Sequence, residues 1–149
     1  MINAPFSGTI VPSGVFVNFV VDASILLAVL TSEPERARIM KLTQGIDLIA
    51  PSSVHWEIGN ALSSMLKRGR ITLVQAESVL KNYEKIPIRF IEVSLAESIQ
   101  IAAEGKTYAY DAYLIACALD QKRRLISLDR ALLEAAKASG VQIAEVPAQ

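Results

Sequence analysis

The chain has 149 residues, a length that normally buries one hydrophobic core, and 52% of them are hydrophobic, so we expect a single folded domain. Its 15 basic and 15 acidic side chains cancel, which excludes a strongly basic protein that coats nucleic acid; any anionic partner must be bound by local charge. With one cysteine (Cys117) and one histidine (His55), the chain cannot form an internal disulfide or a metal site of several thiolates or imidazoles. Any catalytic chemistry must therefore use carboxylates.

The first 32 residues carry one ionisable side chain, Asp22. The uncharged segment before it is interrupted by proline, glycine, serine and asparagine, so it falls short of the roughly 20 apolar residues that span a membrane. It also lacks the basic start of a signal peptide. We therefore expect a soluble, cytoplasmic protein without membrane contact.

Apolar runs and helical periodicity divide the chain into short elements. Val17–Val21 is β-branched and aromatic, which is typical of a strand buried on both faces. Ser53–Lys67 has apolar residues at helical spacing and Gly69 as a stop, and Asp111–Leu119 is apolar on all sides, which indicates a buried helix. In chain order we predict a strand at 17–21, helices at 24–30 and 33–43, a strand at 47–50, helices at 53–67 and 73–83, a strand at 88–93, helices at 95–103 and 111–119, a strand at 125–128, a helix at 130–139 and a strand at 141–146.

This alternation of strands and helices predicts an α/β fold. Because parallel strands need crossover connections, we expect a three-layer α/β/α sandwich with a mostly parallel central sheet. In such sheets the functional crevice lies beyond the carboxyl ends of the strands, where the strand order switches.

Two acids, Asp22 and Asp129, follow predicted strands at this edge. Each could equally be the N-cap of the helix that follows it. Ser24 and Ser127 lie two residues from these acids, and on an extended backbone Ser127 and Asp129 would face the same side and could share a ligand. Local backbone capping is the simpler interpretation of each serine.

Glu57 falls at the edge of the buried stripe of its predicted helix, beside a polar seam of Ser53, Asn60 and Ser64. An ionised carboxylate that faces inward costs several kcal/mol unless it is paired or bound to a metal, so Glu57 needs a partner. A salt bridge to an arginine is the structural alternative.

Asp111 opens the most apolar predicted helix, where it could be a simple N-cap. A buried helix should direct its first turn to the interior region that the central strand ends reach, so Asp111 would join the other acids there. Four acids in one cleft repel one another, and a divalent cation relieves that conflict. All-oxygen ligation favours Mg²⁺ or Mn²⁺, which can activate a water and polarise a phosphodiester.

Four blocks of the sequence resemble the PIN domain family, and more narrowly the VapC-type toxins of toxin–antitoxin pairs. The blocks are VVDAS (20–24), HWEIGNAL (55–62), YDAYLIACAL (110–119) and LISLD (125–129), and the resemblance runs from Val17 to Val146. It implies a PIN-like nuclease domain over 17–149, preceded by an N-terminal extension of unknown role over 1–16.

The resemblance also implies a function. Asp22, Glu57, Asp111 and Asp129 would form the Mg²⁺ or Mn²⁺ site of a ribonuclease, with Ser24 and Ser127 supporting it. It further implies a homodimer and a cognate antitoxin that covers the active-site groove. Two alternatives use the same fold: a catalytically inactive binding or regulatory module, and a phosphoesterase with a different substrate.

Two basic clusters are candidates for binding the RNA backbone: Lys67, Arg68 and Arg70, and Lys122, Arg123 and Arg124. Solvated helix ends are the simpler interpretation of both clusters. For Trp56 we expect packing within the fold, with a partner-facing position as the alternative, and for Cys117 we expect an inert core position.

Overall fold

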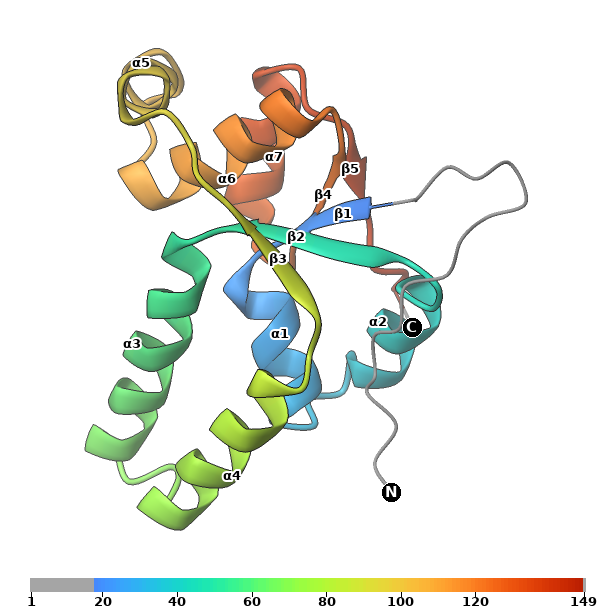
Figure 1. The fold of residues 1–149 in the computed structure, drawn as a ribbon, viewed down its shortest axis with the longest axis vertical. Coiled ribbons are helices and arrows are strands. Elements are labelled where there is room, and N and C mark those ends of the chain that lie inside the picture. The colour runs from blue at the N-terminus through green and yellow to red at the C-terminus, as the bar shows by residue number, and fades with distance from the viewer. Residues whose placement is uncertain (1–17, 149) are drawn as a thin grey trace.

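Five strands form one sheet in the computed structural model, which describes residues 18–148. They are β1 (Asn18–Val21), β2 (Asp47–Pro51), β3 (Ile88–Ile91), β4 (Arg124–Ile126) and β5 (Ile143–Ala144). Their spatial order is β3-β2-β1-β4-β5, and all four neighbouring pairs are parallel (Figure 1). The predicted parallel sheet is therefore confirmed.

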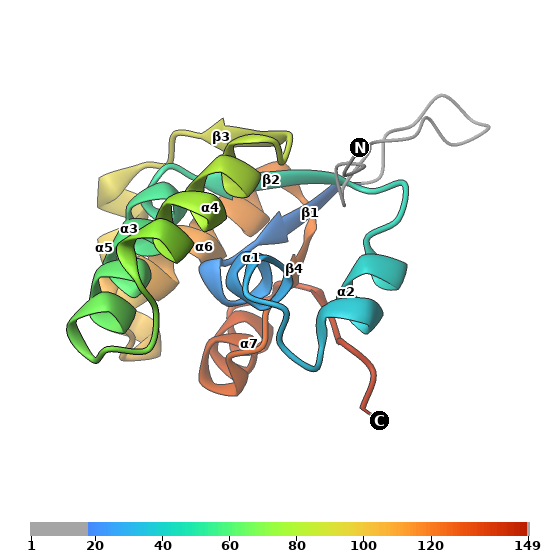
Figure 2. The ribbon, with the colours of Figure 1, turned by 90° about the horizontal axis from the view of Figure 1, so that it is seen from below.

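Helices cover both faces of this sheet and complete the predicted three layers. They are α1 (Ala23–Leu30), α2 (Arg36–Leu42), α3 (Ser53–Lys67), α4 (Leu73–Glu84), α5 (Leu95–Gly105), α6 (Ala109–Gln121) and α7 (Arg130–Ala138). Figure 1 shows α1, α3 and α4 on one side of the sheet, and α5 and α6 on the other. Figure 2 shows β3 and α7 at opposite ends of the molecule, and α7 packs against β4 and β5.

The elements with the most apolar sequences form the centre of the core. Three residues of β1 are buried, and α6 buries six of its thirteen residues, so both elements are central as predicted. Because the strands are parallel, their carboxyl ends lie along one edge of the sheet. The amide of Asp22, after β1, donates a 3.5 Å hydrogen bond to the carbonyl of Ile126 in β4. The ends of these two strands are therefore side by side.

Some element boundaries differ from the prediction. α6 begins at Ala109 instead of 111, because Tyr108 keeps an extended backbone and serves as the N-cap. After α5, Lys106 and not Gly105 adopts the left-handed conformation, with φ of 52°. The proposed extension over 1–16 lies outside the described residues. Across 18–148, the helices are too short or too polar to cross a membrane.

Candidate active site

Asp22 lies where β1 ends and is almost completely buried, with 5% of its surface exposed. Its Oδ1 accepts hydrogen bonds from the Ser24 hydroxyl at 2.7 Å and from the Ile25 amide at 3.3 Å, and its Oδ2 accepts one from the Ser127 hydroxyl at 2.5 Å. The Ile25 contact makes Asp22 the N-cap of α1, so the capping interpretation holds. The Ser127 contact shows that Asp22 also joins two distant segments.

Asp129 follows β4 and caps α7, since its Oδ1 accepts a hydrogen bond from the Leu132 amide at 3.2 Å. The Ser127 hydroxyl oxygen accepts a hydrogen bond from the Asp129 amide at 2.9 Å while its hydrogen goes to Asp22. The Ser24 oxygen likewise accepts one from the Leu128 amide at 3.0 Å. The two serines therefore connect the segment after β4 to Asp22 through hydrogen bonds.

Glu57 is half-buried on α3, and its Oε1 is enclosed without a hydrogen-bond partner. The ion pairs between described residues do not include Glu57, so the salt bridge considered from the sequence is not found there. The Ser53 hydroxyl, one helical turn earlier on the same face, is also buried and unpaired. A buried unpaired carboxylate oxygen is costly, so this position is suited to a cation or a proton from outside the chain.

Asp111 belongs to the first turn of α6 and is half-buried. It is the third helical residue and the N-cap is Tyr108, so the N-cap interpretation of Asp111 is wrong. Figure 1 shows that α3 and α6 both begin on the side of the sheet toward which β1 and β2 run. This arrangement brings Asp111 and Glu57 to the edge where Asp22 and Asp129 lie.

The charges of the four acids act on one another, and we call Asp22, Glu57, Asp111 and Asp129 the acid cluster. Burial raises the pKa of Glu57 to about 7, and the charges of Asp22 and Asp111 contribute. Burial also raises the pKa of Asp111, with a contribution from Asp129. For Asp22, burial raises the pKa more than its hydrogen bonds from Ser127, Ser24 and Ile25 lower it, and Asp129 adds to the rise. The four carboxylates thus form one electrostatic unit.

The acid cluster offers the donor set of a hard divalent cation. It supplies carboxylate oxygens from two strand ends and two helices, and Glu57 Oε1 has no other partner. Residues 18–148 contain no group of three or more His, Cys, Asp or Glu side chains already close enough to enclose a metal ion. The residue types fit Mg²⁺ or Mn²⁺, and the side chains stand further apart than in a closed coordination sphere.

A groove of about 890 Å³ is lined by Ser24 and Ser127, the two serines that bond Asp22, and by none of the four acids. We call it the α1 groove because it follows α1 along Leu27, Ala28 and Thr31. The wall opposite α1 is formed by α7 and the segment after β5. Four basic side chains line the groove as a whole. These are Arg38, Arg70, Arg130 and Lys137. Arg130 was not a sequence candidate, although its place directly after Asp129 at the start of a helix is a signal for it.

Two further expectations have different outcomes. Trp56 is 71% exposed, and its ring lies edge-on to that of His55 with centroids 4.9 Å apart, so the expected packing within the fold is wrong. His55 in turn shares a 3.0 Å hydrogen bond between Nδ1 and the Tyr83 hydroxyl. Cys117 is fully buried as expected, and burial with the charge of Asp120 raises the pKa of its thiol to about 12.

Comparisons with known proteins agree with this architecture. The PIN domain family model matches residues 19–138. Among solved structures, the crystal structure of PAE2754 from Pyrobaculum aerophilum superposes with a TM-score of 0.66 at 23% sequence identity, covering 89% of this chain and 92% of that one. No curated protein sequence matches the chain significantly. At this identity the structural likeness concerns the fold alone.

Proposed function

The chain belongs to the PIN domain family, and from that premise we propose that it is a ribonuclease that hydrolyses RNA phosphodiester bonds with Mg²⁺ or Mn²⁺. The family has a nuclease-type fold, and its members are generally metal-dependent nucleases. The observation that carries the proposal is Glu57 Oε1, which is buried and unpaired while the charges of Asp22 and Asp111 act on its carboxylate. In this proposal the acid cluster holds the cation.

The four acids would have different roles in binding the cation. Asp22 is held by Ser24, Ile25 and Ser127, so its carboxylate is fixed before any ligand arrives. Asp129 is anchored through its cap on α7. Glu57 and Asp111, on separate helices, would supply further carboxylate oxygens, and waters would complete the coordination of the cation.

A bound divalent cation would lower the pKa of a water and polarise the phosphodiester for in-line attack. The chain's part is to orient the carboxylates and to keep them ionised. The hydrogen bonds to Asp22 serve that second purpose, because they oppose the rise in its pKa caused by burial.

The test is RNA cleavage by the wild-type chain and two asparagine variants. We expect Asp111→Asn to abolish cleavage, because Asp111 lies in the acid cluster. Asp120→Asn changes an exposed acid on the same helix and should cleave like the wild type. EDTA should stop cleavage and Mn²⁺ should restore it. Full activity of Asp111→Asn, or undiminished activity in EDTA, would overturn the proposal.

We also propose that the chain is the toxin of a toxin–antitoxin pair and forms a homodimer. The α1 groove supports an antitoxin, because Ser24 and Ser127, which bond Asp22, line it and a protein segment bound there would lie next to the site. Exposed apolar side chains on α5, including Leu95 and Ile99, support a contact with a second copy. Sedimentation tests the dimer, and co-expression with the neighbouring small open reading frame tests the antitoxin. A monomer, or growth arrest that no neighbour relieves, would contradict the respective part.

The two alternative functions predict other results. A catalytically inactive binding module would bind RNA or protein without cleavage at any metal concentration. A phosphoesterase would hydrolyse a chromogenic phosphate ester faster than RNA. Comparing both substrates with the same preparation separates the three functions.

A further inference from the structure

Of the two basic clusters of the sequence, Lys67, Arg68 and Arg70 lie at the end of α3 and in the turn after it, whereas the 122–124 cluster lies at the sheet. Lys122 and Arg123 precede β4 and Arg124 begins it, so they lie at the amino end of that strand. Together with Asn18, at the start of β1, they line a cavity of about 710 Å³. The acid cluster lies beyond the carboxyl ends of the same two strands. The 122–124 cluster is therefore separated from the acid cluster by the length of the strands.

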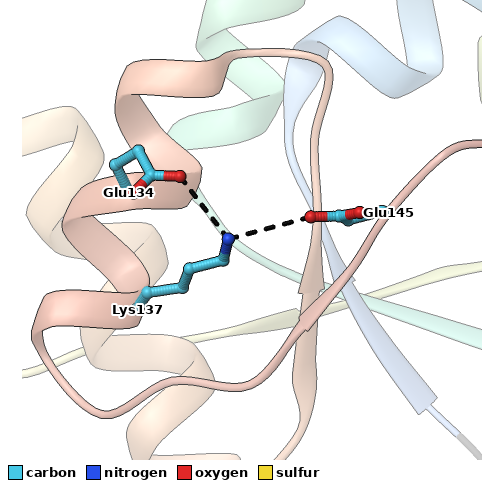
Figure 3. A network of polar contacts seen from close by, with 3 residues as sticks. All are labelled: Glu134, Lys137 and Glu145. Carbon is cyan, nitrogen blue, oxygen red and sulfur yellow. Dashed lines mark hydrogen bonds and ion pairs between the residues drawn. The ribbon is translucent and has the colours of Figure 1, made fainter. Parts of the chain in front are cut away.

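Four basic side chains line the α1 groove, and two of them are already engaged. Arg38 forms an ion pair with Glu35 at 3.9 Å and donates a 2.6 Å hydrogen bond to the carbonyl of Pro147. Lys137 lies between Glu134 at 3.5 Å and Glu145 at 3.7 Å (Figure 3). The charges of these two cations are thus balanced by neighbouring carboxylates of the groove.

The other two, Arg70 and Arg130, are exposed and form no ion pair with any residue of 18–148. Arg130 directly follows Asp129 and so stands beside the acid cluster. Arg70 lies in the turn after α3, further along the groove. The acid Glu33 also lines the groove, beyond the end of α1. Acidic and basic side chains line the groove in equal number, and Arg70 and Arg130 are the two cations among them that form no ion pair within 18–148.

The net charge makes these two cations important for an RNA substrate. A chain with no net charge attracts a polyanion only through local cations, and the acid cluster repels phosphates. A guanidinium group binds a phosphate through two parallel hydrogen bonds, which an ammonium cannot do. Arg130 and Arg70 offer this contact at two positions along one groove.

We propose that Arg130 and Arg70 bind backbone phosphates of the substrate RNA along the α1 groove, and that Lys122, Arg123 and Arg124 do not. This inference rests on the proposed ribonuclease function. The two arginines are positioning residues, because they touch the substrate away from the reacting phosphodiester. A strand bound in this way follows α1 from the acid cluster toward the turn between α3 and α4.

The test is the affinity for a short fluorescein-labelled single-stranded RNA, measured by anisotropy at several KCl concentrations in the Asp111→Asn background. We expect Arg70→Ala and Arg130→Ala each to weaken binding about tenfold and to reduce the slope of log affinity against log salt by about 0.7. Arg70→Lys and Arg130→Lys should each keep the salt slope and lose part of the affinity. The control, K122A/R123A/R124A, should bind like the background variant.

Each outcome decides the inference. The inference is wrong if the Arg70→Ala/Arg130→Ala double variant has the same salt slope as the background variant. It is also wrong if K122A/R123A/R124A loses more RNA affinity than that double variant. The α1 groove would then be a surface for a protein partner only. If the wild type cleaves RNA while the double variant binds normally, the proposed function stands and this inference fails. If the wild type does not cleave RNA but the arginine variants lose affinity, the inference about binding stands and the proposed ribonuclease function fails.

Discussion

The Ser127 hydroxyl donates a 2.5 Å hydrogen bond to Oδ2 of Asp22, from a position 105 residues further along the chain. This contact joins the segment after β4 to the end of β1, at the centre of the sheet. It is made in a site from which water is almost excluded, since Ser127 is 2% exposed. A hydrogen bond to a buried carboxylate is worth more than one at the surface, so Ser127, together with Ser24 and Ile25, holds Asp22 in position and favours its charged form.

Ser127→Ala should therefore destabilise the fold. It leaves Oδ2 of a buried carboxylate without its donor, which raises the pKa of Asp22 further, and we expect the free energy of unfolding at pH 7 to fall by about 1 to 3 kcal/mol. Urea unfolding measures this change. Ser63→Ala, which removes an exposed hydroxyl bonded only to the Asn60 carbonyl, is the control and should cost less than about 0.5 kcal/mol. Equal unfolding midpoints for the two variants would contradict the role of Ser127.

The sequence was sufficient to predict the layers and the order of elements, because each strand and helix has its own apolar period. Every predicted strand and helix is present, α3 at its predicted bounds and the others with one or both ends shifted. The shift at α6 shows that capping does not decide where this helix begins. Tyr108 has no capping side chain and Asp111 has one, yet the helix begins before Asp111. There packing against α5 and the sheet outweighs the local capping preference.

The contacts of the site depended on tertiary structure and could not be predicted. Strand ends placed Asp22 and Asp129 at one edge, but nothing in the local sequence of Ser127 shows that its hydroxyl reaches Asp22. The same holds for Arg70 and Arg130, which line one groove from segments 60 positions apart. Trp56 was assigned to packing from its apolar character alone, which does not determine exposure.

Mn²⁺ should stabilise the wild-type chain against heat, because a ligand that binds only the folded state shifts the unfolding equilibrium. At 100 times the dissociation constant the gain is about 2.7 kcal/mol, which for this length corresponds to a rise in Tm on the order of 5 to 10 °C. Asp111→Asn should show little of this rise, and Asp120→Asn all of it. A thermal shift of the same size in all three proteins would place the cation elsewhere.

The metal-free chain should lose stability as the pH rises from about 4.5 to about 7, because of Glu57. Its pKa is about 7 in the folded chain against 4.5 ordinarily, so in this window the folded state holds a proton that the unfolded state has released. Below 4.5 both states are protonated and the stabilising contribution is fully present. Glu57→Gln removes the contribution of Glu57 to this dependence, while the raised pKa values of Asp22 and Asp111 remain.

Urea unfolding in EDTA at pH 5 to 8 measures the effect. The stability of Glu57→Gln relative to the wild type should increase across this range by about 1 to 2 kcal/mol, less than a fully buried group would give, because the carboxyl is partly in contact with water. Glu77→Gln, on an exposed face of α4, should run parallel to the wild type. Parallel curves for Glu57→Gln and the wild type would contradict the raised pKa.

Asp129 combines a cap with a charge, and two substitutions separate these roles. Asp129→Ala removes the hydrogen bond to the Leu132 amide and should cost about 1 kcal/mol of stability, whereas Asp129→Ser keeps an N-cap acceptor and should stay within a few tenths of the wild type. Both remove the carboxylate from the acid cluster, so both should lose RNA cleavage. Ser94→Ala, which removes the N-cap of α5, should lose about 1 kcal/mol and still cleave RNA. If Asp129→Ser keeps its activity, Asp129 acts only as a cap and the proposed ligands reduce to Asp22, Glu57 and Asp111.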